Sequence, residues 1–567
     1  MSHRIEGEKP KGLRKEEDFL RTRKNSLEHT HLQELREEEG VTIYQGKTEQ
    51  EVHEFFAKYP ESKELKQFEA ALDLSRRVEQ AGGRALAVGG AVRDEIFQIP
   101  PKDIDIEIYG LEPEQIEGIC NQIGKTDAVG RAFGIIKISL GDGAELDVSL
   151  PRVDSKIGVG HKGFTAKVDP HMSIVEAAKR RDFTINALAK NLLTGEIFDG
   201  YGGVNDARER ILRVTDKERF QDDPLRVMRA AQFAARLGLE VEPESAQLIS
   251  EMVPRLSEIP YERMGTEWKK LLLKSERPSL GLQIMVEWGI MREYYPELHV
   301  LRQVPQEFEW HPEGDVWIHT LMVVDEAVRI AKRENLDEEQ TYLLVLSALC
   351  HDLGKATTTK YEEKKGEMRY TSHGHEPAGV EPTKTFLKKL GVNNDMIRQA
   401  SALVGDHLFP GVIYREYQKG AITNIDKAMN HCAERIAPAT LYMLTLVAEA
   451  DSNGRGPFPD PKDPEQLMLQ FGYKIGPWFR KEAQRLNIAK EKPRDILRGQ
   501  ELIDFGFLTK KDGAMFGRII SEANRLRDDL QMSKEDIVAL MSRTHAQENS
   551  NAHTILDALR AIQEETS

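Results

Sequence analysis

The chain has 567 residues, of which 31% are charged and 40% are hydrophobic, with a net charge of −15. This length predicts roughly three or four folded units rather than one core, and the composition predicts a soluble globular protein. No apolar run approaches the roughly 20 residues of a membrane-spanning helix. The negative charge gives no general support for nucleic-acid binding, so any RNA contact would depend on local basic patches.

The N-terminal 45 residues are rich in Glu, Lys and Arg and contain few large apolar side chains. This composition predicts a mobile arm with fragments of helix. The first 20 residues lack the apolar segment of a secretory signal, and the three cysteines have no ligand-like spacing. We therefore expect a cytoplasmic protein with buried thiols. The apolar spacing of residues 49–80 indicates helices that lead into the first folded domain.

Residues 85–110 predict a strand, a glycine turn, a helix and a second strand. In the second strand Asp103 and Asp105 alternate with isoleucines, so two carboxylates project side by side from one face. Their repulsion is relieved by a divalent cation that prefers oxygen ligands, Mg²⁺ above all. Gly89 and Gly90 let the backbone approach an anion, and the following helix offers free N–H groups. The segment therefore indicates the paired metal and phosphate sites that nucleotidyl transfer requires.

An acidic triplet alone is more often a solvated strand face than a metal site. Here the glycine pair, Arg93 and Asp94 accompany it, which favours the site, with Arg93 as a nucleotide-binding residue. The stretch resembles the head domain of class II tRNA nucleotidyltransferases and of the related bacterial poly(A) polymerases, in the polymerase-β superfamily. That resemblance implies an α+β fold, with a small mixed sheet and helices in the head, followed by an all-α neck and body. Gln98 departs from the family pattern, which usually has glycine in this turn.

The next segments predict a helix at 113–122 and strands at 133–138 and 145–148. The resemblance implies that Asp147, in the last of these strands, supplies a third catalytic carboxylate, although a solvated strand carboxylate fits the pattern equally well. Residues 151–171 are rich in glycine and mixed in charge, which predicts a mobile loop near the site.

Residues 179–187 read KRRDFTINA. Taken alone, a basic cluster followed by apolar residues favours a surface helix. The run is similar to the family's RRDFTINA motif, which implies that Arg181 and Asp182 reach the nucleotide ribose. Residues 262–270, ERMGTEWKK, resemble the family's neck motif, and for these we expect a structural role.

Residues 222–230, DDPLRVMRA, predict a helix on which Asp223 and Arg226 share a face. An aspartate accepts from an exocyclic amine and an arginine donates to ring acceptors, so the pair can read C or A and refuse G or U. The alternative is an ordinary surface ion pair. The run resembles the family's EDxxR motif, with Asp222 in place of Glu, and implies an amino-acid template. Arg229 would face the triphosphate or stiffen the helix.

A second chemical centre is indicated by histidines and aspartates at the ends of apolar helices, where a His-Asp pair is costly to bury without a metal. Its members are His319, His351, Asp352 and Asp451. This mixed N/O set suits Mn²⁺, Ni²⁺, Co²⁺, Fe²⁺ or Mg²⁺. The order H, HD, D resembles the HD phosphohydrolase domain, which implies cleavage of phosphoesters such as 2′,3′-cyclic or terminal phosphates on damaged tRNA ends.

His375 and His407 fall between these ligands in the sequence. They either extend the centre toward a second metal or are bystanders. Lys355 is placed to meet a phosphate. A vestigial HD fold would keep the same helices without the activity.

Prolines after Gly454 predict a linker, and residues 492–567 predict a small helical tail that would hold the far end of tRNA. The expected domains are an N-terminal arm at 1–60, the nucleotidyltransferase head at 61–200, a helical neck and body at 201–300, an HD domain at 301–455, and the linker with its tail at 456–567.

Together the motifs predict addition or repair of the 3′-terminal CCA of tRNA from CTP and ATP, without a nucleic-acid template. Bacterial poly(A) polymerase shares the head motifs, but the HD domain and the acidic C-terminus at 561–567 favour the tRNA enzyme. An enzyme that adds only CC or only A stays open, as does oligomeric state. A non-catalytic RNA-binding scaffold is disfavoured by the intact carboxylates.

Overall fold

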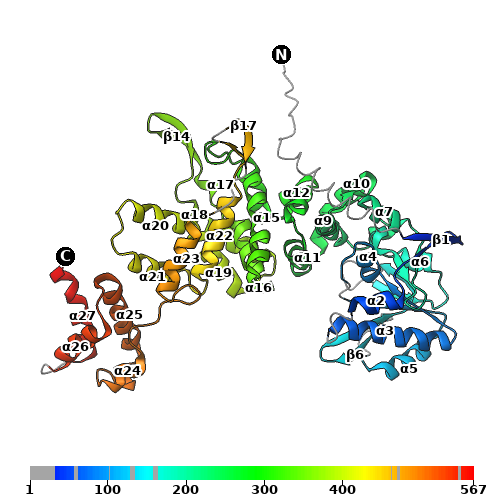
Figure 1. Cartoon of the computed structure of the whole chain (residues 1–567), viewed down its shortest axis with the longest axis horizontal. Helices are drawn as coiled ribbons and strands as arrows, with labels where there is room; N and C mark the ends of the chain where they lie inside the picture. The colour runs from blue at the N-terminus through cyan, green and yellow to red at the C-terminus, as the bar shows by residue number, and fades with distance from the viewer. Residues whose placement is uncertain are drawn as a thin grey trace, which may run out of the picture. The chain divides into compact units, whose positions relative to one another are not determined.

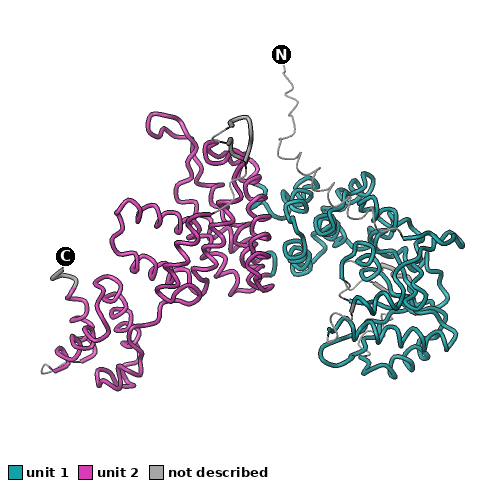
Figure 2. Tube along the Cα trace, in the orientation of Figure 1, with its two compact units in different colours: residues 1–299, 389–391 teal, residues 300–388, 392–567 magenta. Residues whose placement is uncertain are grey.

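The computed structural model describes residues 32–56, 62–100, 103–127, 135–156, 164–460, 463–468, 473–546 and 551–566. The chain divides into two compact units, residues 1–299 with 389–391 and residues 300–388 with 392–567 (Figures 1 and 2). The division lies within one residue of the boundary expected between the neck and the HD domain. Within the described ranges, no helix combines the length and apolar character needed to cross a membrane.

A nine-stranded mixed sheet organises the first unit, as expected for the head, in the order β1-β2-β11-β10-β3-β4-β7-β6-β5. Its strands are β1 (Gln33–Glu38), β2 (Val41–Gln45), β3 (Arg84–Val88), β4 (Asp105–Tyr109), β5 (Lys125–Asp127), β6 (Ile135–Gly141), β7 (Ala144–Ser149), β10 (Leu188–Lys190) and β11 (Glu196–Asp199). In the middle of the sheet, β4 runs antiparallel to β3 and parallel to β7. A separate hairpin joins β8 (Arg152–Lys156) and β9 (Phe164–Val168).

Amphipathic helices cover the sheet. In α3 (Lys63–Gln80) the buried residues recur every three or four positions, from Phe68 to Val78, so one face of the helix packs on β3 and β7. The helix predicted at 113–122 is confirmed as α5 (Pro113–Ile123), which buries Ile116 and Cys120. The remaining head helices are α2 (Glu49–Phe56), α4 (Gly90–Ile96), α6 (Ile174–Ala178) and the short η3 (Thr184–Asn186).

The mobile arm predicted for residues 1–45 is wrong for its last part. Residues 33–45 form the β1–β2 hairpin, and β2 pairs with β11 along the sheet. Ile43 and Tyr44 are buried, whereas every side chain of β1 is exposed. The charged composition of this segment predicted an arm because β1 is an outer strand that buries none of its side chains. Together with α2, the hairpin belongs to the head rather than to a separate arm; residues 1–31 lie outside the described residues.

The neck is helical, as predicted, apart from the parallel pair β12 (Ile211–Leu212) and β13 (Glu240–Val241). Its helices are α7 (Gly203–Glu209), α8 (Lys217–Phe220), α9 (Arg226–Leu237), α10 (Pro243–Met252), η4 (Val253–Glu258), α11 (Tyr261–Lys274), α12 (Pro278–Glu287), α13 (Ile290–Tyr294) and α14 (Pro296–His299). Trp268 of the neck motif is fully buried, edge-on to Tyr295 with the ring centroids 5.0 Å apart. A Cβ on Gly265 would lie 2.0 Å from the Leu390 carbonyl oxygen, so only glycine fits there.

The second unit begins with η5 (Val300–Gln303) and contains a helical bundle. Its helices are α15 (Val316–Glu334), α16 (Glu338–Cys350), α17 (Lys355–Thr358), α18 (His375–Lys389), α19 (Asn394–Gly405), α20 (Phe409–Gln418), α21 (Ile425–Ile436), α22 (Leu441–Asn453) and α23 (Ile475–Arg485). Helices α16 and α22 are apolar nearly all round and almost wholly buried, as expected for central helices. Two hairpins accompany them, β14 (Lys360–Lys364) with β15 (Glu367–Thr371), and β16 (Phe458–Asp460) with β17 (Asp463–Met468).

The predicted helical tail is confirmed. It consists of α24 (Gly499–Asp504), η6 (Lys510–Asp512), α25 (Gly513–Leu530), α26 (Lys534–His545) and α27 (Ala552–Thr566). These helices share a core of their own, to which Leu502, Ile519 and Leu556 contribute. A buried hydrogen bond of 2.8 Å from Asn430 of α21 to Asp528 of α25 joins the tail to the bundle.

Candidate active site and metal centre

Three carboxylates meet on one face of the head sheet. Asp105 on β4 and Asp147 on β7 are directly opposite in the parallel register. Strand β4 begins two residues later than predicted, so Asp103 lies two residues before its start. Asp103 and Asp105 are exposed, whereas Ile104 and Ile106 point into the core. The alternation predicted from the sequence is therefore confirmed, and strand pairing adds Asp147 to the same face.

Burial and neighbouring carboxylates raise the pKa of Asp105. Although its side chain reaches solvent, surrounding protein reduces the hydration of its carboxylate, and the like charges of Asp147 and Asp103 raise its pKa further, against the lowering effect of Arg181. Lys137 of β6 lies opposite Asp147, with its Nζ atom 2.8 Å from Oδ1, and this hydrogen bond raises the pKa of Lys137. Clustered oxygens with incomplete charge compensation fit a divalent cation. The position of Lys137 beside Asp147 depends on the β6–β7 register and cannot be read from the sequence of either strand.

The glycine turn lies beside a partly buried cation, Arg181. Gly89 has a φ of 69°, which requires glycine, and a Cβ at this position would lie 2.7 Å from the Arg181 guanidinium and displace it. Helix α4 begins at the next residue, Gly90. Burial lowers the pKa of Arg181, while Glu107 and Asp105 act to raise it. Arg181 thus lies between the turn and the acidic face, where a positive charge can meet a phosphate. The φ of 55° at Gln98 also explains why glycine is usual there.

Two charged side chains of this region face inward. Arg93 is buried and donates hydrogen bonds to Asp94 and, at 2.7 Å, to Asn186. In this structure it therefore joins α4 to the segment that contains Asn186. Glu107 follows the same alternation as Asp105 but is buried, accepting from Arg180 at 2.6 Å and Tyr109 at 2.7 Å. It therefore cannot join the exposed carboxylates.

Asp182 is a buried junction between the head and helix α9. One oxygen accepts from the Phe183 backbone N–H and from Asn186, and the other accepts from Arg229 at 2.7 Å. Burial by itself would raise the pKa of Asp182, but the charges of Arg229 and Arg226 and these hydrogen bonds lower it to about 2. Arg229, expected to face the triphosphate or stiffen its helix, pairs with Asp182 here.

The template motif differs from the predicted helix over residues 222–230 and does not form the alternative ion pair between Asp223 and Arg226 in this structure. Helix α9 begins at Arg226, so Asp223 lies in the preceding turn, where its Oδ1 accepts from the Leu225 N–H at 3.1 Å. Its Oδ2 is 3.5 Å from Arg263 of the neck motif. Arg226 donates instead to the backbone carbonyls of Arg219, at 2.7 Å, and Arg180, at 2.5 Å. Both side chains are thus oriented by other partners, and Arg263 was given only a structural role from the sequence.

The second unit brings the four predicted HD residues together. His319 lies in the first turn of α15, His351 caps the end of α16, and Asp451 lies in the last turn of α22. Donor atoms of these three residues all lie within 4.8 Å of one another, and His319 Nε2 is 3.1 Å from Asp451 Oδ1. Asp352 is adjacent, with its Oδ2 atom 3.1 Å from His351 Nε2.

His375 and His407 extend the centre. With Asp352 they form a second buried group whose donor atoms lie within 4.8 Å, and His375 Nε2 is 3.4 Å from Asp352 Oδ1. The two oxygens of Asp352 therefore face two different groups of histidines. Burial, followed by the neighbouring charges of His351 and His375, lowers the pKa of His407 to about 3. A neutral histidine is the form that binds a metal.

The histidine ring orientations fit metal ligation. The Nδ1 atoms of His351, His375 and His407 each lie within 2.8 Å of a backbone carbonyl three residues earlier, which directs Nε2 into the centre. The Nε2 atom of His351 is buried and makes no hydrogen bond within the described residues. A divalent metal would satisfy this atom, so the residues present fit such an ion.

Glu313 supports the centre and was missed from the sequence. Its Oε1 atom is 2.9 Å from His319 Nδ1 and 2.8 Å from His311 Nδ1, and its Oε2 accepts from the Gly456 N–H at 3.0 Å. Burial opposes ionisation, but the hydrogen bonds from both histidines lower the pKa of Glu313 to about 2. The signal was an H-x-E triplet just before the helix that carries His319.

Lys355, expected to meet a phosphate, is buried in this structure. Its Nζ atom is 2.7 Å from Asp352 and donates to Gln306 at 2.8 Å. Lys355 therefore lies within the HD centre, where its positive charge offsets the negative charge of Asp352.

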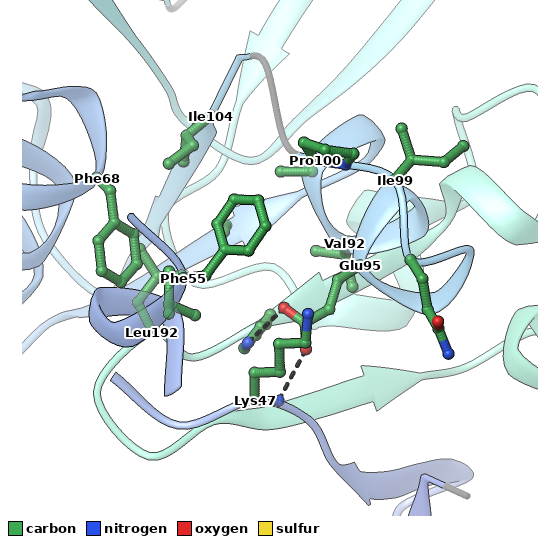
Figure 3. Close-up of a pocket in the computed structure, with 14 residues that line it drawn as sticks. Lys47, Phe55, Phe68, Val92, Glu95, Ile99, Pro100, Ile104 and Leu192 are labelled. Atoms are coloured by element: carbon green, nitrogen blue, oxygen red, sulfur yellow. Dashed lines mark hydrogen bonds and ion pairs between the residues drawn. The ribbon is translucent and has the colours of Figure 1, made fainter. Parts of the chain in front are cut away.

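The head also contains a mostly apolar pocket that is separate from its carboxylates (Figure 3). Phe55, Phe68 and Val92 line it, and Glu95 accepts from Lys190 at 2.6 Å. Its wall includes Ala87 of β3, which points to the sheet face opposite Asp105 because side chains alternate along the paired strands. Asp103, Asp105 and Asp147 are therefore not among the residues that line this pocket.

Comparisons with known families agree with this architecture. Residues 85–213 match the poly A polymerase head domain, residues 238–301 match the probable RNA and SrmB-binding site of polymerase A, and residues 316–446 match the HD domain. The multifunctional CCA protein of Mannheimia succiniciproducens is 33% identical over 68% of this chain and 88% of its own length. That of Xanthomonas campestris pv. campestris is 35% identical over 65% of this chain and 84% of its own length.

A solved structure shares the fold. The CCA-adding enzyme of Bacillus stearothermophilus in complex with CTP aligns with 88% of this chain and 99% of its own, with a TM-score of 0.56 and 22% identity. The head, neck and HD domain together define a nucleotidyltransferase of the poly(A) polymerase class. More narrowly, the extent and identity of the sequence matches show that the chain belongs to the family of multifunctional CCA proteins.

Proposed function

We propose that this protein adds or repairs the 3′-terminal CCA of tRNA from CTP and ATP, without a nucleic-acid template. The single observation that carries the proposal is the pairing of Asp105, on the strand that follows the glycine turn and α4, with Asp147 on the neighbouring strand β7, close to Asp103. The names of the relatives supply the CCA sequence that is added. The family resemblance implies tRNA as its acceptor, and we infer a cytoplasmic location from that substrate.

In this reaction, metal binding and phosphate binding would belong to different residues of the head. Asp103, Asp105 and Asp147 would hold Mg²⁺, which supplies charge to neutralise the triphosphate and lowers the pKa of an attacking hydroxyl. Gly89 and Gly90 leave the start of α4 open to phosphate oxygens, and Arg181 places a cation beside the same turn in the structure.

Base selection and sugar recognition would belong to the neck side of the site. Asp223 and Arg226 would read the edge of C or A, held by Arg263 and by backbone carbonyls respectively. Asp182 would contact the ribose, and Arg93 and Arg229 keep the surrounding segments in place through their ion pairs.

Purified protein, Mg²⁺ and labelled CTP or ATP test this proposal, with tRNAs that lack the last three, two or one nucleotides. We expect CCA to be completed on each and addition to stop there. Long A tails would identify a poly(A) polymerase, addition of only CC or only A would identify a partial enzyme, and absence of incorporation would contradict the proposal.

For the HD centre we infer a metal-dependent phosphohydrolase that acts on 2′,3′-cyclic or terminal phosphates of RNA ends. The histidine orientations and the bridging position of Asp352 support it. The six residues would hold one or two ions of Ni²⁺, Mn²⁺, Co²⁺, Fe²⁺ or Mg²⁺, which supply a nucleophilic hydroxide. Metal analysis of the purified protein, with hydrolysis measured after removal and return of each ion, tests both points. Hydrolysis unaffected by chelation would contradict a metal-dependent activity.

A further inference from the structure

Four aromatic side chains of the second unit are open to solvent beside the HD centre. Phe308 is 73% exposed, Trp310 is 56% exposed, Tyr361 is 58% exposed and Tyr370 is 38% exposed. We refer to these four residues as the aromatic platform. Large aromatic rings left open to solvent are costly to hydrate and commonly mark a binding site.

The platform is built from a hairpin and a turn. Tyr361 on β14 and Tyr370 on β15 are directly opposite in the antiparallel register, with ring centroids 4.7 Å apart. Phe308 and Trp310 project from a turn at 307–311, closed by a 2.9 Å hydrogen bond from the His311 N–H to the Glu307 carbonyl. The turn is docked on β15, because Glu307 accepts from the Tyr370 N–H at 3.1 Å and Glu309 pairs with Arg369.

The hairpin is anchored to the metal centre at its base. Thr359, just before β14, and Ser372, just after β15, join through their hydroxyls at 2.8 Å. The Ser372 carbonyl in turn lies 2.8 Å from Nδ1 of His375, a residue of the second donor group. At the other strand, Lys355 precedes the hairpin by a few residues and pairs with Asp352.

The turn is anchored to the same centre. Trp310 is followed by His311, whose ring contacts Glu313, and Glu313 contacts His319. The hairpin and the turn are therefore both joined to the HD centre by direct contacts, so a ligand stacked on the rings would lie on the same segments that hold the donor residues.

The chemistry of the platform selects its ligand. The four cations of the hairpin are offset by three glutamates of the hairpin and two of the turn, so phosphate attraction contributes little here and stacking on the rings would carry the binding. The cations are Lys360, Lys364, Lys365 and Arg369, and the glutamates are Glu307, Glu309, Glu362, Glu363 and Glu367. Flat rings instead stack on bases that are not already paired, which is how single-stranded RNA is held, at roughly 1–3 kcal/mol per base. A phosphoester centre next to such rings favours a strand end.

We propose that the aromatic platform stacks the terminal bases of single-stranded RNA whose end phosphate enters the HD centre. This inference rests on the phosphohydrolase function proposed above and specifies its substrate as an unpaired RNA end of any sequence, rather than a free phosphate or a mononucleotide recognised by its phosphate alone. Sequence tolerance follows because every base offers a flat face.

The test compares the Trp310→Ala/Tyr361→Ala double variant with wild type, as metal-loaded full chains hydrolysing a short RNA that ends in a 2′,3′-cyclic phosphate. We expect KM to rise about 5- to 150-fold, the equivalent of 1–3 kcal/mol, with kcat changed less than about 2-fold. The matched control is Tyr417→Ala, which removes a 43% exposed ring on α20. The Trp310→Phe variant keeps a flat ring and should stay close to wild type.

Separate readouts distinguish the platform from the phosphohydrolase. If wild type hydrolyses no RNA end, the proposed HD function fails, and equilibrium binding of the same RNA then tests the platform, with a Kd weakened about 5- to 150-fold in the double variant. An unchanged Kd and KM overturn the proposal. A loss of self-association in the double variant with unchanged RNA binding also overturns it, because the rings would then serve a contact between copies. Unchanged metal content of the HD centre shows that the second unit of the double variant is folded.

Discussion

At the scale of single residues, Lys137 is the counter-charge to the acidic face of the head. Because its Nζ atom holds Asp147 at 2.8 Å, it competes with a metal for the same oxygens. We expect Lys137→Ala to lower the Mg²⁺ concentration for half-maximal CTP incorporation by about 2- to 5-fold, since an exposed pair is worth roughly 0.2–1 kcal/mol. A magnesium titration measures this, with Lys66→Ala as control because Lys66 pairs with Asp142 in the same unit. A higher magnesium requirement would show instead that Lys137 assists the reaction.

Glu313 acts on the HD centre through His319. By accepting from Nδ1 it fixes the ring that directs Nε2 to a metal. We expect Glu313→Gln to weaken metal binding by about 10- to 100-fold, because the amide is a poorer acceptor and cannot serve both histidines equally. Metal competition with a chelating dye measures the affinity. Glu381→Gln, at an exposed carboxylate on α18, should leave it unchanged; equal losses in the two variants would contradict a positioning role for Glu313.

At the scale of elements, the pair between Asp182 and Arg229 fastens α9 to the head. The pKa of Asp182 is lowered in the folded protein to about 2, so its stabilising effect is complete above pH 4 and is lost as the pH falls toward 2. The effect amounts to about 2 kcal/mol near neutrality. The free energy of unfolding of wild type and Asp182→Asn, measured in urea, should differ by about 1 kcal/mol less at pH 3 than at pH 5. A pH-independent difference would contradict this assignment.

The start of α9 presents the two residues expected to select the base. Arg226 is held by the carbonyls of Arg219 and Arg180, and Asp223 by Arg263, so their directions are set before a nucleotide binds. We expect Arg226→Ala to relax the choice among the four nucleotides by about 1–3 kcal/mol, more than it weakens triphosphate binding. Incorporation assays with each nucleotide separately measure the choice. An equal loss for all four would contradict base reading by this side chain.

The sequence could place those site residues whose relative positions are set within one strand or helix. The alternation of Asp103, Ile104 and Asp105 fixes a shared face within one strand, and the structure confirms it. The position of Asp147 opposite Asp105 depends on which strands pair, and pairing between distant strands is not encoded in either strand alone. The same limit applies to the HD centre, where packing of α16, α18 and α19 decides that His375 meets His407.

At the scale of the whole molecule, the two chemical centres lie in different compact units. We therefore expect Asp105→Ala to abolish nucleotide incorporation while leaving hydrolysis of cyclic phosphate, and His351→Ala to do the reverse. Each variant supplies the folding control for the other. Parallel assays of both activities measure the outcome, and loss of incorporation in both variants would contradict two independent centres.

Most of the architecture followed from hydrophobic patterns and motifs, including the mixed sheet, the helical neck, the HD bundle and the tail. The failure was the N-terminal hairpin at 33–45, where charge density suggested an arm. Only Val41, Ile43 and Tyr44 signalled a strand, and three residues are too few to outweigh the composition around them.

That hairpin has a consequence for the stability of the head in solution. Strand β2 occupies the hydrogen-bonding edge of β11, and the charged side chains of β1 (QELREE) form the new outer border. A chain shortened to begin after residue 45 would leave β11 with unpaired N–H and C=O groups. Such an exposed edge can pair with a strand of another molecule. The β1–β2 hairpin, whose composition is that of a disordered segment, therefore protects the sheet edge against aggregation between copies of the protein.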